Sequence, residues 1–139
     1  MAKALTRPEN LCYYVTAREI AGIDARKLAA TRDMWQRHGG LSVVELQVLF
    51  AAAGLSVGVM ALRDIEDVRR AVVAAGLARG GSCERFGLAF VRGDGTGHMV
   101  VARYLKGSVR VDYRDYQCER TGADATGDVA TATHFFLFI

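Results

Sequence analysis

Three side chains whose chemistry suits nucleophilic catalysis lie far apart in the sequence: Cys12, His98 and Asp115. A thiolate is a strong nucleophile, an imidazole can accept and return its proton, and a carboxylate can orient the imidazole and stabilise its charged form. Such a set attacks an amide or ester carbon and forms an acyl intermediate on sulfur. The elements around each residue decide whether the three side chains can meet.

Cys12 lies where a helix is expected to begin. Asn10 can cap a helix whose first turns read LCYYVTAREIAG. The positive end of the helix dipole favours a thiolate in that first turn, and backbone N–H groups there can stabilise an oxyanion. The side chain of Asn10 is a further candidate donor. A free cysteine is also commonly a small buried apolar residue, so a structural role for Cys12 stays open.

His98 and Asp115 fall on a predicted β-hairpin, GHMVVARYLKGSVRVDYRDYQ at 97–117. With Lys106 and Gly107 as a two-residue turn, His98 lies directly opposite Asp115 on one face of the hairpin. The carboxylate would then orient the imidazole. The structural alternative is a histidine that hydrogen-bonds within a core and an aspartate on the surface.

Two further residues of this hairpin are candidates for the site. Asp112 opposes Val101 in the same register and points to the other face. Because a one-residue slip exchanges the two faces of a strand, Asp112 remains the alternative third member. Gln117 follows Asp115 closely and is a candidate for binding the oxyanion or the substrate.

The elements predicted along the chain are helices first and strands afterwards. Helices are expected over 11–22, 24–37, 43–54 and 65–76, where polar caps precede apolar runs and glycines close them. Strands are expected over 55–62, 86–92, 98–105, 108–116 and 133–139, and 118–131 reads as a polar loop. This order predicts an α+β fold in which N-terminal helices pack on an antiparallel sheet, in a single domain over residues 1–139.

Composition and charge exclude several classes of protein. The chain has 139 residues, of which 51% are hydrophobic and 24% charged, and its net charge is +3. These values are typical of a globular domain, and the scattered Lys and Arg predict no nucleic-acid partner. The spacing of the three cysteines and three histidines predicts no disulfide framework and no metal site. The N-terminus does not read as a signal peptide, and no apolar window is long enough for a membrane span, so a soluble protein without a membrane partner is expected.

Three segments resemble the papain-like fold domains of bacterial polymorphic toxins and effectors: NLC at 10–12, GLSVVELQVLFAAAGLSVGV at 40–59 and GHMVVARYLKGSVRVDYRDYQ at 97–117. In that family a helix-borne Cys, a His after Gly at a strand start and an Asp after the following strand form a triad. The resemblance assigns these roles to Cys12, His98 and Asp115, with Asp112 as the rival third member. Residues 115–117 fit the family's Asp-x-Gln.

The resemblance implies a minimal papain-like fold and a cysteine hydrolase that needs no cofactor. The substrate would be a protein, attacked at a peptide bond or at a glutamine side chain. A cognate immunity protein would protect the producing cell, and delivery into a target cell would rely on a secretion system or on a larger parent protein. Transfer to an amine instead of water is a third reaction, and a non-catalytic binding module with a structural Cys and His is the alternative of another class.

Overall fold

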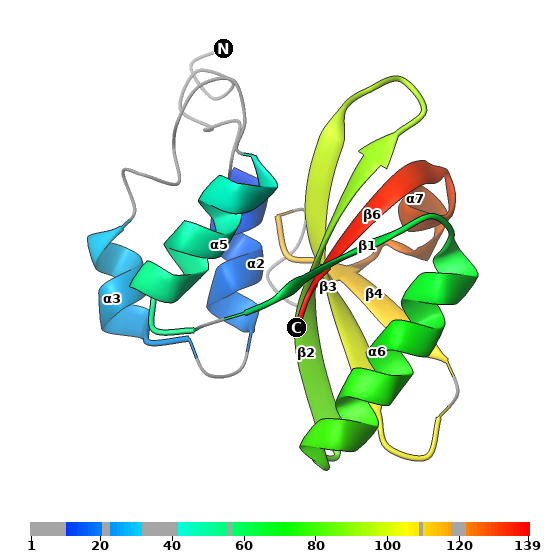
Figure 1. Cartoon of the computed structure of the whole chain (residues 1–139), viewed down its shortest axis with the longest axis horizontal. Helices are drawn as coiled ribbons and strands as arrows, with labels where there is room; N and C mark the ends of the chain where they lie inside the picture. Colours follow the sequence, from blue (N-terminus) through cyan, green and yellow to red (C-terminus); the bar gives the residue numbers. More distant parts are fainter. Residues whose placement is uncertain (1–10, 21–22, 32–41, 56, 109, 118–121) are drawn as a thin grey trace.

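One six-stranded antiparallel sheet with helices on both faces forms the computed structural model (Figure 1). The structure describes residues 11–20, 23–31, 42–55, 57–108, 110–117 and 122–139. The strands, in the sheet order β1-β6-β2-β3-β4-β5, are β1 Val59–Leu62, β6 Ala132–Phe138, β2 Cys83–Arg92, β3 Gly97–Leu105, β4 Val111–Asp115 and β5 Ala123–Asp124. The described helices are α2 Leu11–Glu19, α3 Ala25–Ala30, α5 Val43–Ala52, α6 Ile65–Arg79 and α7 Thr126–Ala130. The predicted α+β class with an antiparallel sheet is confirmed.

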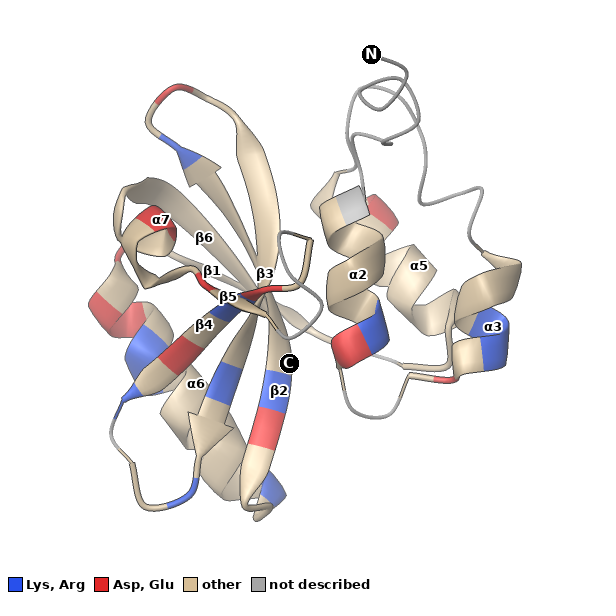
Figure 2. Cartoon of the chain, turned by 180° about the vertical axis from the view of Figure 1, so that it is seen from behind, with Lys and Arg blue, Asp and Glu red and all other residues tan. Residues whose placement is uncertain are grey.

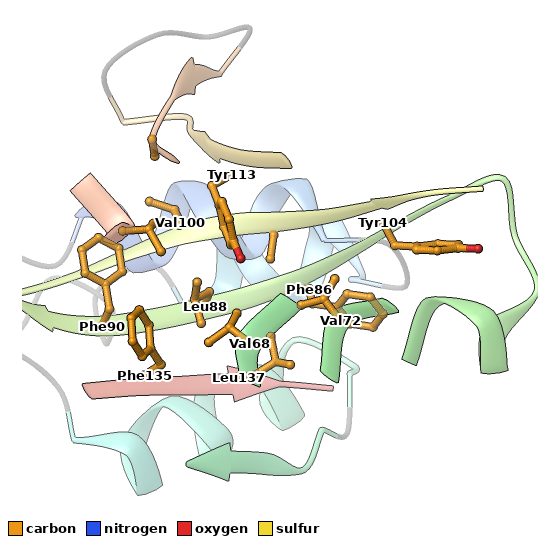
Figure 3. Packing of buried hydrophobic residues seen from close by; sticks show 13 residues of the cluster. Val68, Val72, Phe86, Leu88, Phe90, Val100, Tyr104, Tyr113, Phe135 and Leu137 are labelled. Carbon is orange, nitrogen blue, oxygen red and sulfur yellow. The ribbon is translucent and has the colours of Figure 1, made fainter. Parts of the chain in front are cut away.

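The central strands are buried on both faces, which explains their nearly continuous apolar sequence. Residues 99–102 of β3 are each 0% exposed. One core cluster joins the sheet to α2 and α5; its buried members include Cys12, Leu46, Leu49, Phe50 and Met99. The second joins the opposite face to α6 (Figure 3); it includes Val68, Val72, Phe86, Leu88 and Phe135. The sheet is thus the middle layer between two sets of helices.

Three helices begin at the polar caps that the sequence predicts. The carboxylate of Asp24 accepts hydrogen bonds from two backbone N–H groups at the start of α3, and that of Asp64 accepts one at the start of α6. Ser42 and Glu45 form the predicted capping box of α5. Each such cap contributes about 1 kcal/mol to stability. The predicted cap Asn10, the closing Gly22 and the end of the helix predicted over 24–37 lie outside the described residues.

Helix α6 does not end at Gly76, as the sequence predicted, but continues to Arg79 and ends at Gly80, whose φ of 76° suits a glycine. Gly76 serves a packing role within the helix. A Cβ placed there would lie 2.2 Å from Cγ of Tyr104 on β3. The glycine therefore allows the backbone of α6 to approach the aromatic ring closely, and it does not stop the helix.

The predicted polar loop over 118–131 is wrong for its described part, residues 122–131. Residues 123–124 pair with the end of β4 as β5, and residues 126–130 form the short helix α7. Ala125 and Val129 are 5% and 0% exposed, so two apolar side chains anchor this segment to the core. The start of β1 also differs: the strand begins at Val59 and not at Leu55, whose N–H still bonds to the end of α5.

We expect Gly76→Ala to lower the free energy of unfolding by about 1–3 kcal/mol, because the new methyl group overpacks the contact with Tyr104. Gly127→Ala in α7 is the matched control, since no atom lies within 4 Å of the position that its Cβ would take. That substitution should be neutral or stabilise by up to about 1 kcal/mol. Urea denaturation of both variants measures the difference, and equal stabilities would contradict the packing role of Gly76.

Candidate active site

The start of helix α2 lies against the start of strand β3, because one hydrogen bond ties the two elements together. The hydroxyl of Thr16, 1% exposed, donates to the backbone carbonyl of Met99 at 3.2 Å. Cys12 precedes Thr16 by one helical turn and so shares its face of α2, and His98 precedes Met99 on β3. The sequence thus places a thiol and an imidazole at the same end of the helix–sheet contact.

The imidazole of His98 is engaged from two sides. Its Nε2 lies 2.7 Å from Oδ2 of Asp115, and the side chain of Cys12 on α2 acts on the ring and raises its pKa. Asp115 is itself fixed, since the backbone N–H of Gln117 donates to its Oδ1 at 2.9 Å. The predicted contact between His98 and Asp115 is therefore present.

The contact exists although the predicted hairpin register was wrong by two residues. In the structure Val101 pairs with Arg114, not with Asp112, and β3 and β4 are separated by the longer segment 106–110. An ST turn, in which Ser108 accepts from the N–H of Arg110, lengthens this connection. A shift of two residues leaves every side chain on its predicted face. By the same register, Asp115 lies opposite Val100, two residues after His98. Its carboxylate therefore reaches the imidazole diagonally across the two strands.

The surroundings of His98 favour its charged form. Burial lowers the pKa of the imidazole, but the hydrogen bonds to Asp115 and Cys12 and their charges outweigh it and raise the pKa to about 9. The side chains of His98 and Asp115 are only 12% and 11% exposed, so solvent screens their interaction little. At neutral pH the site therefore holds an imidazolium between a carboxylate and a sulfur atom.

The other predicted site residues are dispersed. Asp112 lies on the opposite face of β4, where it accepts from Nε of Arg103 at 2.8 Å and from Nε of Arg114 at 2.9 Å. Figure 2 shows acidic and basic positions on the neighbouring strands β2, β3 and β4. Asp112 is thus separated from His98 and is an ion-pair residue. Gln117 does reach the site through its backbone, whereas Asn10 lies outside the described residues.

The sequence prediction missed four residues near the triad. Phe90, the cross-strand partner of His98, packs its ring at 88° to the imidazole with centroids 5.7 Å apart. Nε and Nη2 of Arg92 bind the two carboxylate oxygens of Asp128 at 2.8 and 2.7 Å, and the Asp128 charge acts on His98. Burial, with a smaller contribution from Cys12, raises the pKa of Tyr13 to about 12. The GDGTG turn could have indicated Phe90, but nothing indicated Asp128, since α7 was expected to be loop.

Of the two other cysteines, the structure describes only Cys83, which lies away from His98. The strand predicted from residue 86 begins at Cys83, which is exposed at the start of β2. Cys118 lies outside the described residues. Cys12 is accordingly the thiol that the described residues bring to His98.

No three His, Cys, Asp or Glu side chains gather as a possible metal-ligand group anywhere in the described ranges. The candidate site is therefore described by its own side chains: a sulfur, an imidazole and a carboxylate.

Among the helices that the structure describes, none combines the length and the apolar character needed to cross a bilayer.

Comparisons with protein-family models, with curated proteins and with solved structures gave no match for this chain. The resemblance to papain-like toxin domains accordingly stays an expectation based on short motifs. Function has to be argued from the geometry of Cys12, His98 and Asp115.

We expect the stability of the protein to fall as the pH rises from about 6.5 to about 9, because of His98. Its pKa is raised on folding, so in this window the folded state binds a proton that the unfolded state has released. The contribution is complete below pH 6.5 and is lost as the pH passes the folded pKa of about 9. Urea denaturation at several pH values measures it.

His98→Gln is the control for this pH dependence, because glutamine keeps a hydrogen-bonding group but does not titrate. The decline between pH 6.5 and 9 should be much shallower in the variant. Parallel curves for the two proteins would mean that His98 has an ordinary pKa in the folded state.

Proposed function

We propose that the protein is a cysteine-dependent amide hydrolase of papain-like arrangement, in which Cys12 is the nucleophile, His98 the acid and base, and Asp115 the residue that orients His98. The observation that carries the proposal is the two-sided engagement of His98. Its Nε2 lies 2.7 Å from the Asp115 carboxylate, while Cys12 acts on the ring and raises its pKa. A nucleophile, its base and an orienting third group are the parts that such a reaction requires.

The proposed reaction follows from this order of groups. The Cys12 thiolate attacks the amide carbon, and His98 donates its proton to the departing nitrogen, so that ammonia or an amine leaves and a thioester forms. His98 then removes a proton from water, which attacks the thioester and releases the acid and the thiolate. Cys12 is the second residue of α2 as the structure describes it, so its N–H lies in the first helical turn, where backbone N–H groups can stabilise the oxyanion.

Burial of the pair supports a chemical role. Moving an imidazolium and a carboxylate from water into the protein interior costs free energy. An apolar pair of similar size often stabilises a protein to the same degree. His98 and Asp115 are nonetheless both largely buried, and a thiol adjoins them. A buried charge pair beside a nucleophile is a common feature of active sites, where surroundings shift the pKa of the reacting groups.

The proposed substrate is a protein, at a peptide bond or a glutamine side chain, because both reactions hydrolyse an amide through the same thioester. Action as a bacterial toxin or effector, with a cognate immunity protein as partner, is the proposed setting and rests on the motif resemblance alone. The triad by itself does not distinguish hydrolysis by water from transfer to an amine.

The burial of Cys12 favours a second candidate function, a non-catalytic binding module. Cys12 is 3% exposed and belongs to the core cluster between α2, α5 and the sheet. A small buried thiol that fills space in this apolar cluster would need no chemistry. Under this alternative His98 and Asp115 would only join β3 to β4.

Thiol alkylation separates the two candidates. A cysteine with the usual pKa of about 8.5 is almost fully protonated at pH 6 and reacts slowly with iodoacetamide. We expect Cys12, paired with the imidazolium, to be labelled faster at pH 6 than the exposed Cys83 of the same chain. Peptide mass spectrometry of the folded protein measures both rates. Labelling of Cys12 only after denaturation would leave the binding module as the better account.

Substitution of the triad tests the activity. Expression of Cys12→Ala or His98→Ala in bacterial and eukaryotic cells should abolish any growth arrest that the wild type causes, and Asp115→Asn should weaken it strongly, because each removes a part of the proton path. Asp112→Asn is the matched control on the same strand and should retain full activity.

Mass spectrometry of proteins from arrested cells then identifies the reaction. One-dalton increases at glutamine indicate deamidation, and new termini indicate peptide-bond cleavage. Equal behaviour of the wild type and both Ala variants, with all three soluble and folded, would contradict the proposed chemistry.

A further inference from the structure

A cavity of about 380 Å³ lies away from the triad, between α6, the segment that enters β4, and the start of α7. Its lining residues are Ile65, Glu66, Arg69, Arg110, Val111, Tyr113 and Thr126. The volume falls within the range of about 300–1,000 Å³ that small-molecule sites occupy. None of its lining residues belongs to the triad, so its occupant would be bound independently of the proposed reaction.

The side chain of Tyr113 lines this cavity, and its hydroxyl oxygen is buried. Tyr113 is 4% exposed, and its hydroxyl oxygen has no hydrogen-bond partner among the described residues. The hydroxyl points toward α6 (Figure 3), and the charges of Arg69 and Glu66 on that helix act on it. Burial raises the pKa of Tyr113 to about 12, so the group keeps its proton and is a donor at neutral pH. A buried hydroxyl without a partner is costly, and an acceptor oxygen would remove the cost.

The charges around the cavity favour an anion. Arg69 and Glu66 neutralise each other, because Nε of Arg69 donates to both carboxylate oxygens at 3.0 and 2.9 Å. The guanidinium of Arg110 has no carboxylate partner among the described residues, which leaves one positive charge in the lining. Guanidinium groups bind carboxylates in a planar, two-pronged geometry.

The rest of the lining favours an apolar body on that anion. Ile65 of α6 and Val111 of β4 contribute aliphatic lining to the cavity. The hydroxyl of Thr126 already donates to the carboxylate of Asp124 at 2.7 Å, so it adds no free donor. A bare inorganic anion would leave the aliphatic walls exposed to water, whereas an organic acid would cover them.

We propose that this cavity binds a small organic carboxylate, whose charged group pairs with Arg110 and accepts a hydrogen bond from Tyr113 while its apolar body lies between Ile65 and Val111. The site is distinct from the triad. Tyr113 and Asp115 nevertheless share a strand, so an occupied cavity would hold β4 against α6 two residues before the carboxylate that orients His98.

Benzoate is a suitable probe, with benzyl alcohol as the uncharged analogue and inorganic phosphate as the anion without an apolar body. We expect benzoate to shift the backbone amide resonances of β4 and α6 in a saturable manner. Tyr113→Phe should weaken binding about fivefold, the effect of one neutral hydrogen bond. Arg110→Gln should weaken it about tenfold or more, because a charge-assisted pair is lost.

The controls keep the result interpretable. Arg70→Gln alters an exposed arginine of α6 outside the cavity and should bind benzoate like the wild type. Tyr113→Phe removes a hydroxyl that has no partner, so its melting temperature should not fall. Cys12→Ala should bind unchanged, which separates this proposal from the fate of the proposed hydrolase.

Three outcomes would overturn the proposal. The first is the absence of saturable shifts with benzoate. The second is binding that both Tyr113→Phe and Arg110→Gln leave undiminished. The third is equal binding of benzyl alcohol or of phosphate. Equal binding of benzyl alcohol would show that the charge is not needed, and equal binding of phosphate would show that the apolar body is not needed.

Discussion

The hydrogen bond from Thr16 to the carbonyl of Met99 is the constraint on which the arrangement of the site depends. It joins the helical layer to the sheet at a buried point, where an unpaired hydroxyl or carbonyl would be costly. Each partner of this bond is preceded in the chain by a residue of the candidate site. Cys12 lies one turn before Thr16 on α2, and His98 lies one residue before Met99 on β3. The apolar cluster around it prevents the helix from sliding, because Phe50, Leu46 and Met99 are almost completely buried.

The sheet contributes the second half of the geometry. His98 and Asp115 meet because β3 and β4 are adjacent and antiparallel, and because both side chains lie on the same face. The same alternation sends Asp112 to the other face, where Arg103 and Arg114 bind it. Two aspartates three residues apart thus have different partners, one an imidazole and the other a pair of guanidinium groups. This separation follows from the two-residue period of a strand.

Most helices and strands could be predicted from local patterns in the sequence. The turns between them and the contacts between distant residues could be predicted less often. The caps at Asp24, Ser42 and Asp64 and the apolar runs of β2, β3 and β6 could be recognised because each signal lies within a few residues. Gly76 was misinterpreted because the partner that requires it, Tyr104, lies on a distant strand. The contact of His98 with Asp115 was predicted despite the wrong turn, since an even shift preserves the face. The Arg92–Asp128 pair depends on α7, which carries only weak local signals.

Strand β6 has a consequence for how the protein is made. It lies in the interior of the sheet, between β1 and β2, and pairs Phe138 with Val59 and with Gly87. Synthesis delivers the chain from its N-terminus, so β1 and β2 emerge from the ribosome long before the strand that must lie between them. Until then each presents an unpaired edge, and such edges are templates for aggregation. The sheet is therefore complete only once residues 132–138 have entered the gap between β1 and β2.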